Sequence, residues 1–90
     1  MRQLHFTRSY RDDVKRLKTR GYDFARLTAV VQTLAAGGNL EAKFRDHPLK
    51  GNWKGWRECH ITPDWLLIYL ADRTNVTLTR TGTHADLFNK

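Results

Sequence analysis

The apolar positions in the first part of the chain repeat with the spacing of a helix. A first stripe at i, i+4 and i+7 consists of Tyr10, Val14 and Leu17. This stripe predicts a helix that Thr7 or Ser9 caps and that Gly21 ends. Ahead of it, residues 4–6 alternate apolar and polar side chains and predict a short strand.

A second helical repeat follows after Asp23, which is a candidate N-cap. Its apolar members are Phe24, Leu27, Val30, Val31 and Leu34. Gly37 and Gly38 end the pattern. We therefore expect a helical hairpin that turns around residues 21–22.

The apolar pattern changes in the second half of the chain. Residues 39–52 read as a loop, in which the proline after His47 favours an extended backbone. Strands are then predicted at residues 53–61, 65–71 and 76–81. The turns between them are short, which indicates an antiparallel meander. Residues 65–71 are apolar on both faces, so this strand should be central.

The last segment carries a helix-capping signature, since Thr83 stands three residues before Asp86. It predicts a short helix over residues 84–88. Ninety residues are too few for two cores, so residues 1–90 should form a single domain. The predicted fold class is α+β, with an antiparallel sheet packed against an N-terminal helical hairpin and a short C-terminal helix.

Charge adds the first indication of function. Sixteen Lys and Arg against nine Asp and Glu give a formal net charge of +7. This excess suits a polyanionic partner, either a nucleic acid or an acidic protein, and charge alone does not choose between them. Cys59 is the single cysteine, so a reducing cytoplasm is expected. The sequence shows neither an 18-residue apolar run nor the apolar region of a signal peptide, so we expect no membrane association.

Three histidines stand next to predicted turns or element ends. His84 opens the final helix, where the positive helix end favours a phosphate and a histidine can exchange protons near neutral pH. His60 shares a strand face with Glu58 and precedes the turn that contains Asp64, a carboxylate that could orient an imidazole. His47 lies in a basic loop. Each of the three is equally compatible with an ordinary surface, half-buried or loop histidine.

Arg80, near the end of the last predicted strand, could bind a phosphate through two hydrogen bonds. Strict alternation places it on the apolar face of Val76 and Leu78, so either the strand bulges there or Arg80 is structural. Five large aromatics are candidates for stacking on bases, although such residues are more often core: Trp53, Trp56, Trp65, Tyr69 and Phe88. The spacing of His and Cys residues matches no common metal motif, so no metal site is expected.

Two segments carry a specific resemblance to a known family. They run from Asp46 to Tyr69, DHPLKGNWKGWRECHITPDWLLIY, and from Arg80 to Phe88, RTGTHADLF. Both closely resemble the YafQ branch of the RelE/ParE toxin superfamily. The match covers the second half of the chain, while the first half agrees only in architecture.

The resemblance implies a RelE-like fold and a ribosome-dependent endoribonuclease toxin of a type II toxin–antitoxin system. Relatives cut mRNA in the A site of the 70S ribosome, with no metal or other cofactor, by attack of the RNA 2′-OH on the adjacent phosphorus. The implied partners are a cognate antitoxin and ribosome-bound mRNA, with operator DNA contacted only through the antitoxin complex.

The resemblance also assigns roles to residues. The implied catalytic residues are His47, His60, Asp64 and His84. The implied substrate-binding residues are Arg80, Phe88, Lys50, Lys54, Trp65 and Glu58. His84 is expected to be the general acid, and His47 or His60, with Asp64 orienting or sharing the proton, the base; acid and base are interchangeable at this point. Arg80 would stabilise negative charge on the phosphate, and Phe88 would pack on a base.

Two other readings remain open. The chain could be a non-catalytic toxin of the same fold, such as a ParE-like gyrase inhibitor, or a basic nucleic-acid-binding module. A metal-dependent nuclease is the third reading. The set of His and Asp residues favours the endoribonuclease toxin over a protein that only binds, because binding alone does not need these residues.

Overall fold

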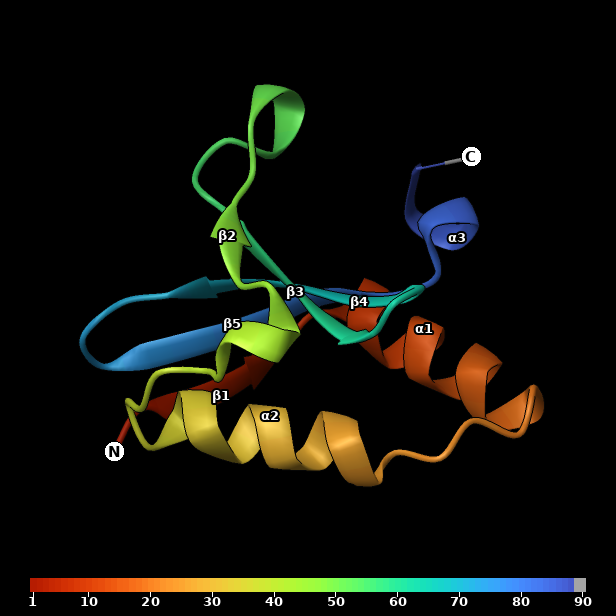
Figure 1. Ribbon diagram of the computed structural model, residues 1–90, viewed down its shortest axis with the longest axis horizontal. Coiled ribbons are helices and arrows are strands. Elements are labelled where there is room, and N and C mark those ends of the chain that lie inside the picture. Colours follow the sequence, from red (N-terminus) through yellow and green to blue (C-terminus); the bar gives the residue numbers. More distant parts are fainter. Residues whose placement is uncertain (89–90) are drawn as a thin grey trace.

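A computed structural model describes residues 1–88 and shows a five-stranded sheet with helices on both sides (Figure 1). The strands are ordered β1-β5-β4-β3-β2. Their bounds are β1 Gln3–Phe6, β2 His47–Pro48, β3 Arg57–Thr62, β4 Trp65–Ala71 and β5 Asn75–Gly82. The helices are α1 Arg8–Thr19, α2 Ala25–Ala35 and α3 His84–Phe88, with short 3-10 turns η1 Ala42–Phe44 and η2 Gly51–Trp53.

The predicted meander is confirmed, since β3, β4 and β5 pair antiparallel in sequence order. Two features of the sheet differ from the prediction. β1 pairs with β5 in parallel, and the chain between these two strands includes both long helices and strands β2, β3 and β4. Residues 39–52 are not only a loop: His47 and Pro48 form β2, which pairs with Glu58 and Arg57. The first predicted strand of the meander is also shorter than expected, because residues 51–53 form η2.

The two long helices begin and end close to their predicted limits. The Thr7 hydroxyl accepts a hydrogen bond from the Tyr10 amide at 3.0 Å and caps α1, as predicted. The predicted cap of α2 is wrong by one residue. Phe24 occupies the N-cap position, and the Asp23 carboxylate accepts from the Ala25 amide at 3.0 Å instead.

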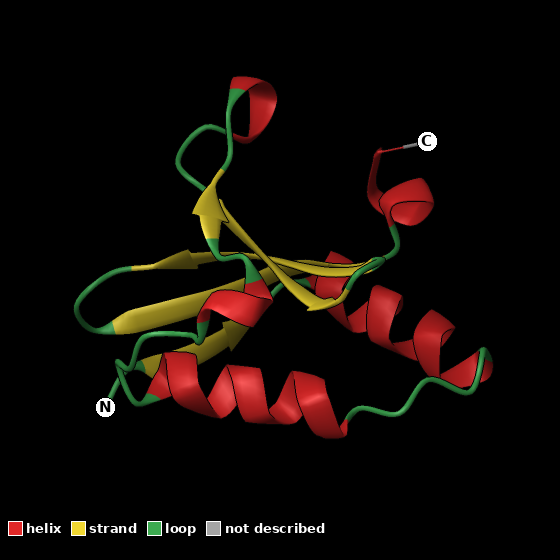
Figure 2. Cartoon of the chain, viewed as in Figure 1, coloured by secondary structure: helices red, strands yellow, loops and turns green. Residues whose placement is uncertain are grey.

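Both long helices pack on one face of the sheet, as predicted (Figure 2). The core between them consists of Tyr10, Leu17, Leu27, Val30, Leu34, Cys59, Ile61, Trp65, Leu67, Tyr69, Val76 and Leu78. Burial raises the pKa of the Cys59 thiol to about 12, so this thiol is protonated and inert in the folded chain. The other face of β3, β4 and β5 is turned toward α3 and the segment around β2 (Figure 1).

No helix among residues 1–88 combines the length and the apolar character needed to cross a bilayer.

Candidate active site

Three histidines that are distant in sequence lie side by side on the face of the sheet away from α1 and α2. They come from three elements: His47 from β2, His60 from β3 and His84 from the first turn of α3. The ring centroids of His47 and His60 are 6.1 Å apart, and those of His60 and His84 are 5.9 Å apart. His60 is therefore the centre of a row in which His47 and His84 are the outer members.

Glu58 joins two of these histidines. Its carboxylate Oε1 lies 3.2 Å from His60 Nε2 and 3.5 Å from His47 Nε2. The register explains this arrangement, because Glu58 is opposite His47 across the β2–β3 pair and shares a face with His60 two residues further along β3. The Glu58 side chain is only 7% exposed, so the two imidazoles are its polar surroundings.

The hydrogen bonds fix different ring nitrogens in His47 and His60. His47 Nδ1 lies 3.1 Å from the Pro48 carbonyl, which requires an N–H at Nδ1 and leaves the lone pair of neutral imidazole on Nε2. His60 instead directs Nε2 at the Glu58 carboxylate, and its Nδ1 is buried without a partner among the described residues. In neutral His60 the lone pair is thus on the buried nitrogen, whereas in neutral His47 it is on Nε2, which lies 3.5 Å from the Glu58 carboxylate at the open side of the row.

Asp64 pairs with His84 rather than with His60. Asp64 Oδ1 lies 2.6 Å from His84 Nδ1 and accepts the His84 backbone N–H at 3.2 Å. The expectation that Asp64 supports His47 or His60 is therefore wrong. The reason is topological: Leu66 pairs with Gly82, so the turn that carries Asp64 lies next to the start of α3. The hydrogen bond from the His84 side chain is the main cause that lowers the pKa of Asp64, which keeps it ionised at neutral pH.

Arg80 reaches the site because β5 contains a bulge. Leu78 pairs with Tyr69 and Arg80 pairs with Ile68, so Thr79 is an extra residue on β5. The bulge moves Arg80 off the face of Val76 and Leu78. Arg80 then follows Glu58 and Ile68 in one cross-strand row, about 10 Å from Glu58 at the spacing of paired strands. The bulge that the sequence left as an alternative is thus present.

Asp13 of α1 holds this arginine, and sequence reasoning missed it. Its carboxylate accepts from Arg80 Nε at 2.7 Å and Nη2 at 3.1 Å, and from the Thr81 amide at 3.1 Å. Arg16 adds a fourth donor at 2.6 Å. Asp13 is 2% exposed, and an acidic residue beside the apolar stripe of α1 was the available signal. Arg80 is therefore a structural residue whose side chain still remains 27% exposed.

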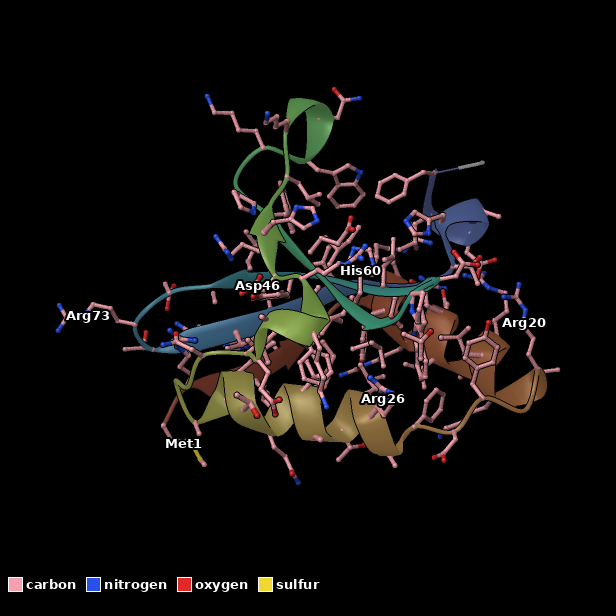
Figure 3. The ribbon with its side chains drawn as sticks, viewed as in Figure 1. Met1, Arg20, Arg26, Asp46, His60 and Arg73 are labelled. Atoms are coloured by element: carbon pink, nitrogen blue, oxygen red, sulfur yellow. The ribbon has the colours of Figure 1, made fainter. Side chains whose placement is uncertain are left out.

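A second contact from α1 holds α3 in place. Thr83 and Asp86 form the predicted capping box, with reciprocal bonds of 3.0 and 3.1 Å. Arg20, at the end of α1, donates to both oxygens of Asp86 at 2.8 and 2.9 Å. A Cβ atom on Gly82 would lie 3.0 Å from the Asp86 side chain, so any larger residue would displace this carboxylate from its present position. Figure 3 shows Arg20 at the α3 end of the molecule.

The aromatic candidates fall into different environments. Trp65 is 3% exposed and donates its indole N–H to Thr81 at 2.9 Å, so the predicted substrate contact is wrong for this buried side chain. Trp56 is half-buried and donates to Thr79 at 3.1 Å, across β4 on the site face. Trp53 packs edge-on against it, with 5.5 Å between ring centroids. Phe88 is half-buried at the end of α3.

Lys50 and Lys54 flank η2, and both are exposed. They stand beyond β2, on the segment that projects from the site side of the sheet (Figure 1). The structure thus brings His47, Glu58, His60, Asp64, His84 and Arg80 together and leaves these two lysines at the margin.

The residues that could bind a metal are His47, Glu58 and His60. Each offers one ligand atom, and these atoms lie within 4.8 Å of one another. Two imidazoles and a carboxylate suit a transition metal such as zinc or copper. Ligand spacing along the chain does not reveal this group, because the paired strands β2 and β3 assemble it.

Comparison with known proteins gives the family. The model of the family described as "Bacterial toxin of type II toxin-antitoxin system, YafQ" matches residues 2–89. The mRNA interferase toxin YafQ of Escherichia coli K12 is 40% identical over 88 residues, which are 97% of this chain and 96% of that protein. A structure of the E. coli DinJ-YafQ toxin-antitoxin complex matches with a TM-score of 0.90 at 40% identity, over 97% of each chain. A metal-bound toxin from Helicobacter pylori matches with a TM-score of 0.90 at 39% identity, over 98% of this chain and 100% of that one. The chain therefore belongs to the YafQ family of bacterial toxins of type II toxin–antitoxin systems.

Proposed function

We propose that this chain is an mRNA interferase toxin that cuts ribosome-bound mRNA by acid–base chemistry of its own side chains. One observation carries the proposal: His47 and His84 are the two ends of one row of imidazoles, and each has a partner that fixes its ring. Cleavage by a 2′-OH needs a base on one side of the phosphate and an acid on the other. The related E. coli protein is named an mRNA interferase toxin, which supports the same activity.

His47 is the general base of the proposed reaction. Its Nδ1–H is directed to the Pro48 carbonyl, so Nε2 can accept the proton of the 2′-OH. The 2′-oxygen then forms a bond to phosphorus. His60 is less suited to this step, because its free nitrogen is the buried Nδ1. His60 and Glu58 position the base, since both imidazoles contact the same carboxylate oxygen.

His84 is the general acid. Asp64 accepts from Nδ1, so Nε2 is the nitrogen that donates a proton to the departing 5′-oxygen. The bond between phosphorus and this oxygen breaks, which gives a 2′,3′-cyclic phosphate and a 5′-OH. Arg80, oriented by Asp13, stabilises the negative charge that develops on the phosphoryl oxygens.

The partners of the proposed toxin follow from its charge and its relatives. A net charge of +7 favours both the RNA-rich ribosome and an acidic antitoxin. The structure of the E. coli relative with DinJ supports a cognate antitoxin for this chain. Operator DNA would be contacted through the antitoxin complex, and the site of action would be the cytoplasm.

The test is expression of the chain without its antitoxin, followed by mapping of new 5′ ends in cellular mRNA. We expect cuts in frame with codons that disappear when translation is blocked. The His84→Ala chain should make no cuts, yet still bind the antitoxin. Equal toxicity of the His84→Ala chain, or cuts that persist on free RNA, would contradict the proposal.

A metal-dependent nuclease is the second candidate, and the group of His47, Glu58 and His60 favours it. A structure of the H. pylori relative is described as metal-bound. The two candidates differ in one measurement. Purified toxin on programmed ribosomes should keep its full rate in a chelator if the acid–base mechanism holds, and should lose it if a metal is required.

A further inference from the structure

A second, basic pocket adjoins the row of histidines. It has a volume of about 160 Å³ and lies where β3 extends past the end of β2. Its lining includes Arg26 of α2, Lys43 of η1, Arg45 and residues 60–63 at the end of β3. His60 is thus a wall of this pocket and, at the same time, the central member of the histidine row.

The charge of this pocket is not used within the fold. Among residues 1–88, no carboxylate lies within ion-pair distance of Arg26, Lys43 or Arg45, whereas Asp13 and Asp86 bind arginines elsewhere in the fold. The Arg26 guanidinium and the Lys43 ammonium lie 5.9 and 5.3 Å from the Phe44 ring centroid, so this ring holds both charged groups in cation–π contacts beside the pocket. Three exposed cations, two of them in contact with the Phe44 ring, thus line one pocket that suits an anion.

The backbone fixes the position of Arg45 relative to the site. Arg45 has φ of +49°, and it is the one residue other than glycine with a positive φ in the described part of the chain. The next residue, Asp46, accepts from Tyr69 at 2.8 Å and from Arg57 at 3.2 Å. His47 follows directly. Arg45 of the pocket and His47, the proposed general base, therefore flank Asp46. The hydrogen bond from Tyr69 of β4 to Asp46 holds this segment against the sheet.

We propose that this pocket binds a phosphate of the RNA strand next to the phosphate that is cut. The proposal rests on the proposed function. An RNA substrate carries a further phosphate on each side of the scissile one, and His60 leads from the histidine row directly into the pocket. Guanidinium groups bind phosphate oxygens in pairs, so Arg26 and Arg45 would set the register of the strand over His47 and His84.

The test pairs a charge removed from the protein with a charge removed from the RNA. Arg45→Asn removes the cation and keeps a residue that tolerates the left-handed backbone, and Arg26→Gln is a second variant on the exposed side of α2. Arg73→Gln is the matched control, since Arg73 lies at the β4–β5 turn, far from Arg26 (Figure 3). The substrates are ribosome-bound mRNAs with one methylphosphonate, on a 2′-deoxy nucleotide, at successive positions beside the cut.

We expect Arg45→Asn and Arg26→Gln to lower kcat/KM on unmodified mRNA about tenfold, and Arg73→Gln to leave it unchanged. At one flanking position the methylphosphonate should lower kcat/KM of the wild-type chain by the same factor as the two substitutions. On that modified mRNA, the wild-type chain and both variants should then have equal kcat/KM. If the effect of each substitution and the effect of the methylphosphonate on kcat/KM multiplied at every position, the proposed phosphate pocket would be overturned. So would variants that cleave normally but no longer bind the antitoxin, which would identify an acidic protein as the occupant. Failure of the wild-type chain to cut unmodified mRNA would instead contradict the proposed function.

Discussion

At the scale of single residues, the buried carboxylate of Asp13 organises one side of the site. Three of its four hydrogen bonds come from Arg80 and the Thr81 amide, which belong to the strand that enters the active site. A buried charge is stable only while its partners remain in place. Asp13 thereby links the position of Arg80, the proposed phosphate-binding residue, to the stability of the whole chain.

Replacing Asp13 should therefore affect stability and catalysis together. Asp13→Ala leaves Arg80 without its counter-charge and the Thr81 amide without an acceptor, so we expect the free energy of unfolding to fall by about 3 kcal/mol. Urea denaturation of the variant measures this loss. The neighbouring Asp12 is exposed, so Asp12→Ala is the control and should lie within about 0.5 kcal/mol of wild type. Equal urea midpoints for the two variants would show that Asp13 does not stabilise the fold in this way.

The ring orientation of His47 gives a prediction about rate. His47→Gln should lower kcat by about a hundredfold to ten-thousandfold, because it removes the proposed base. The limb of the pH–rate profile that falls toward acid should disappear with it. His5→Gln is the control, because His5 contacts Asn75 at the distant end of the sheet. This substitution should leave kcat unchanged. A His47→Gln chain that retains the acid limb would assign the base to another residue.

At the scale of elements, α1 is the frame on which the site is mounted. Its middle holds Arg80 of β5 through Asp13, and its end holds α3 through Arg20 and Asp86. α3 is only five residues long and has no buried residue, so it depends on these external bonds for its position. Movement of α3 would carry His84 away from the histidine row.

The Arg20–Asp86 pair should make the position of α3 depend on pH. The side-chain hydrogen bond from Arg20 holds the pKa of Asp86 well below its usual range. The pair therefore stabilises the fold above the unfolded pKa of about 3.9, and this contribution is lost as pH falls through the lower folded value. Thermal melting of wild type and Asp86→Asn should differ at pH 6 and converge as the pH drops below about 4. A constant difference down to strongly acidic pH would contradict this role of the ionised carboxylate.

The elements themselves were largely predictable from the sequence, and the arrangement that connects them was not. Helical periodicity located both long helices, because packing against one face leaves a regular apolar pattern. β4 was located by its unbroken apolar run, because a central strand is buried on both faces. The parallel pairing of β1 with β5 leaves no local signal, since the partners are more than seventy residues apart. The resemblance of residues 46–69 and 80–88 to the YafQ family is confirmed. It named the histidines, Asp64 and Glu58, but not which histidine each carboxylate contacts. It did not name Asp13 either, because these contacts depend on register and on a bulge.

At the scale of the whole molecule, the core shields its single thiol. Cys59 is 0% exposed and its pKa is raised to about 12, so a thiol reagent meets neither an accessible group nor a thiolate. We expect the native chain to react with such a reagent at least about a thousandfold more slowly than the urea-unfolded chain. The residual rate should follow global unfolding as urea is raised. Rapid labelling of native protein would mean that β3 opens locally.

The parallel pairing of β1 with β5 has a consequence for biosynthesis. The first strand can pair only when residues 75–78 have been made, and His84 and Asp86, which place α3, lie further along the chain. Until these residues have been made, a nascent chain lacks both the parallel strand pair and His84 of the histidine row. The order of synthesis therefore places the assembly of this row after both long helices and the strands β3 and β4 are complete.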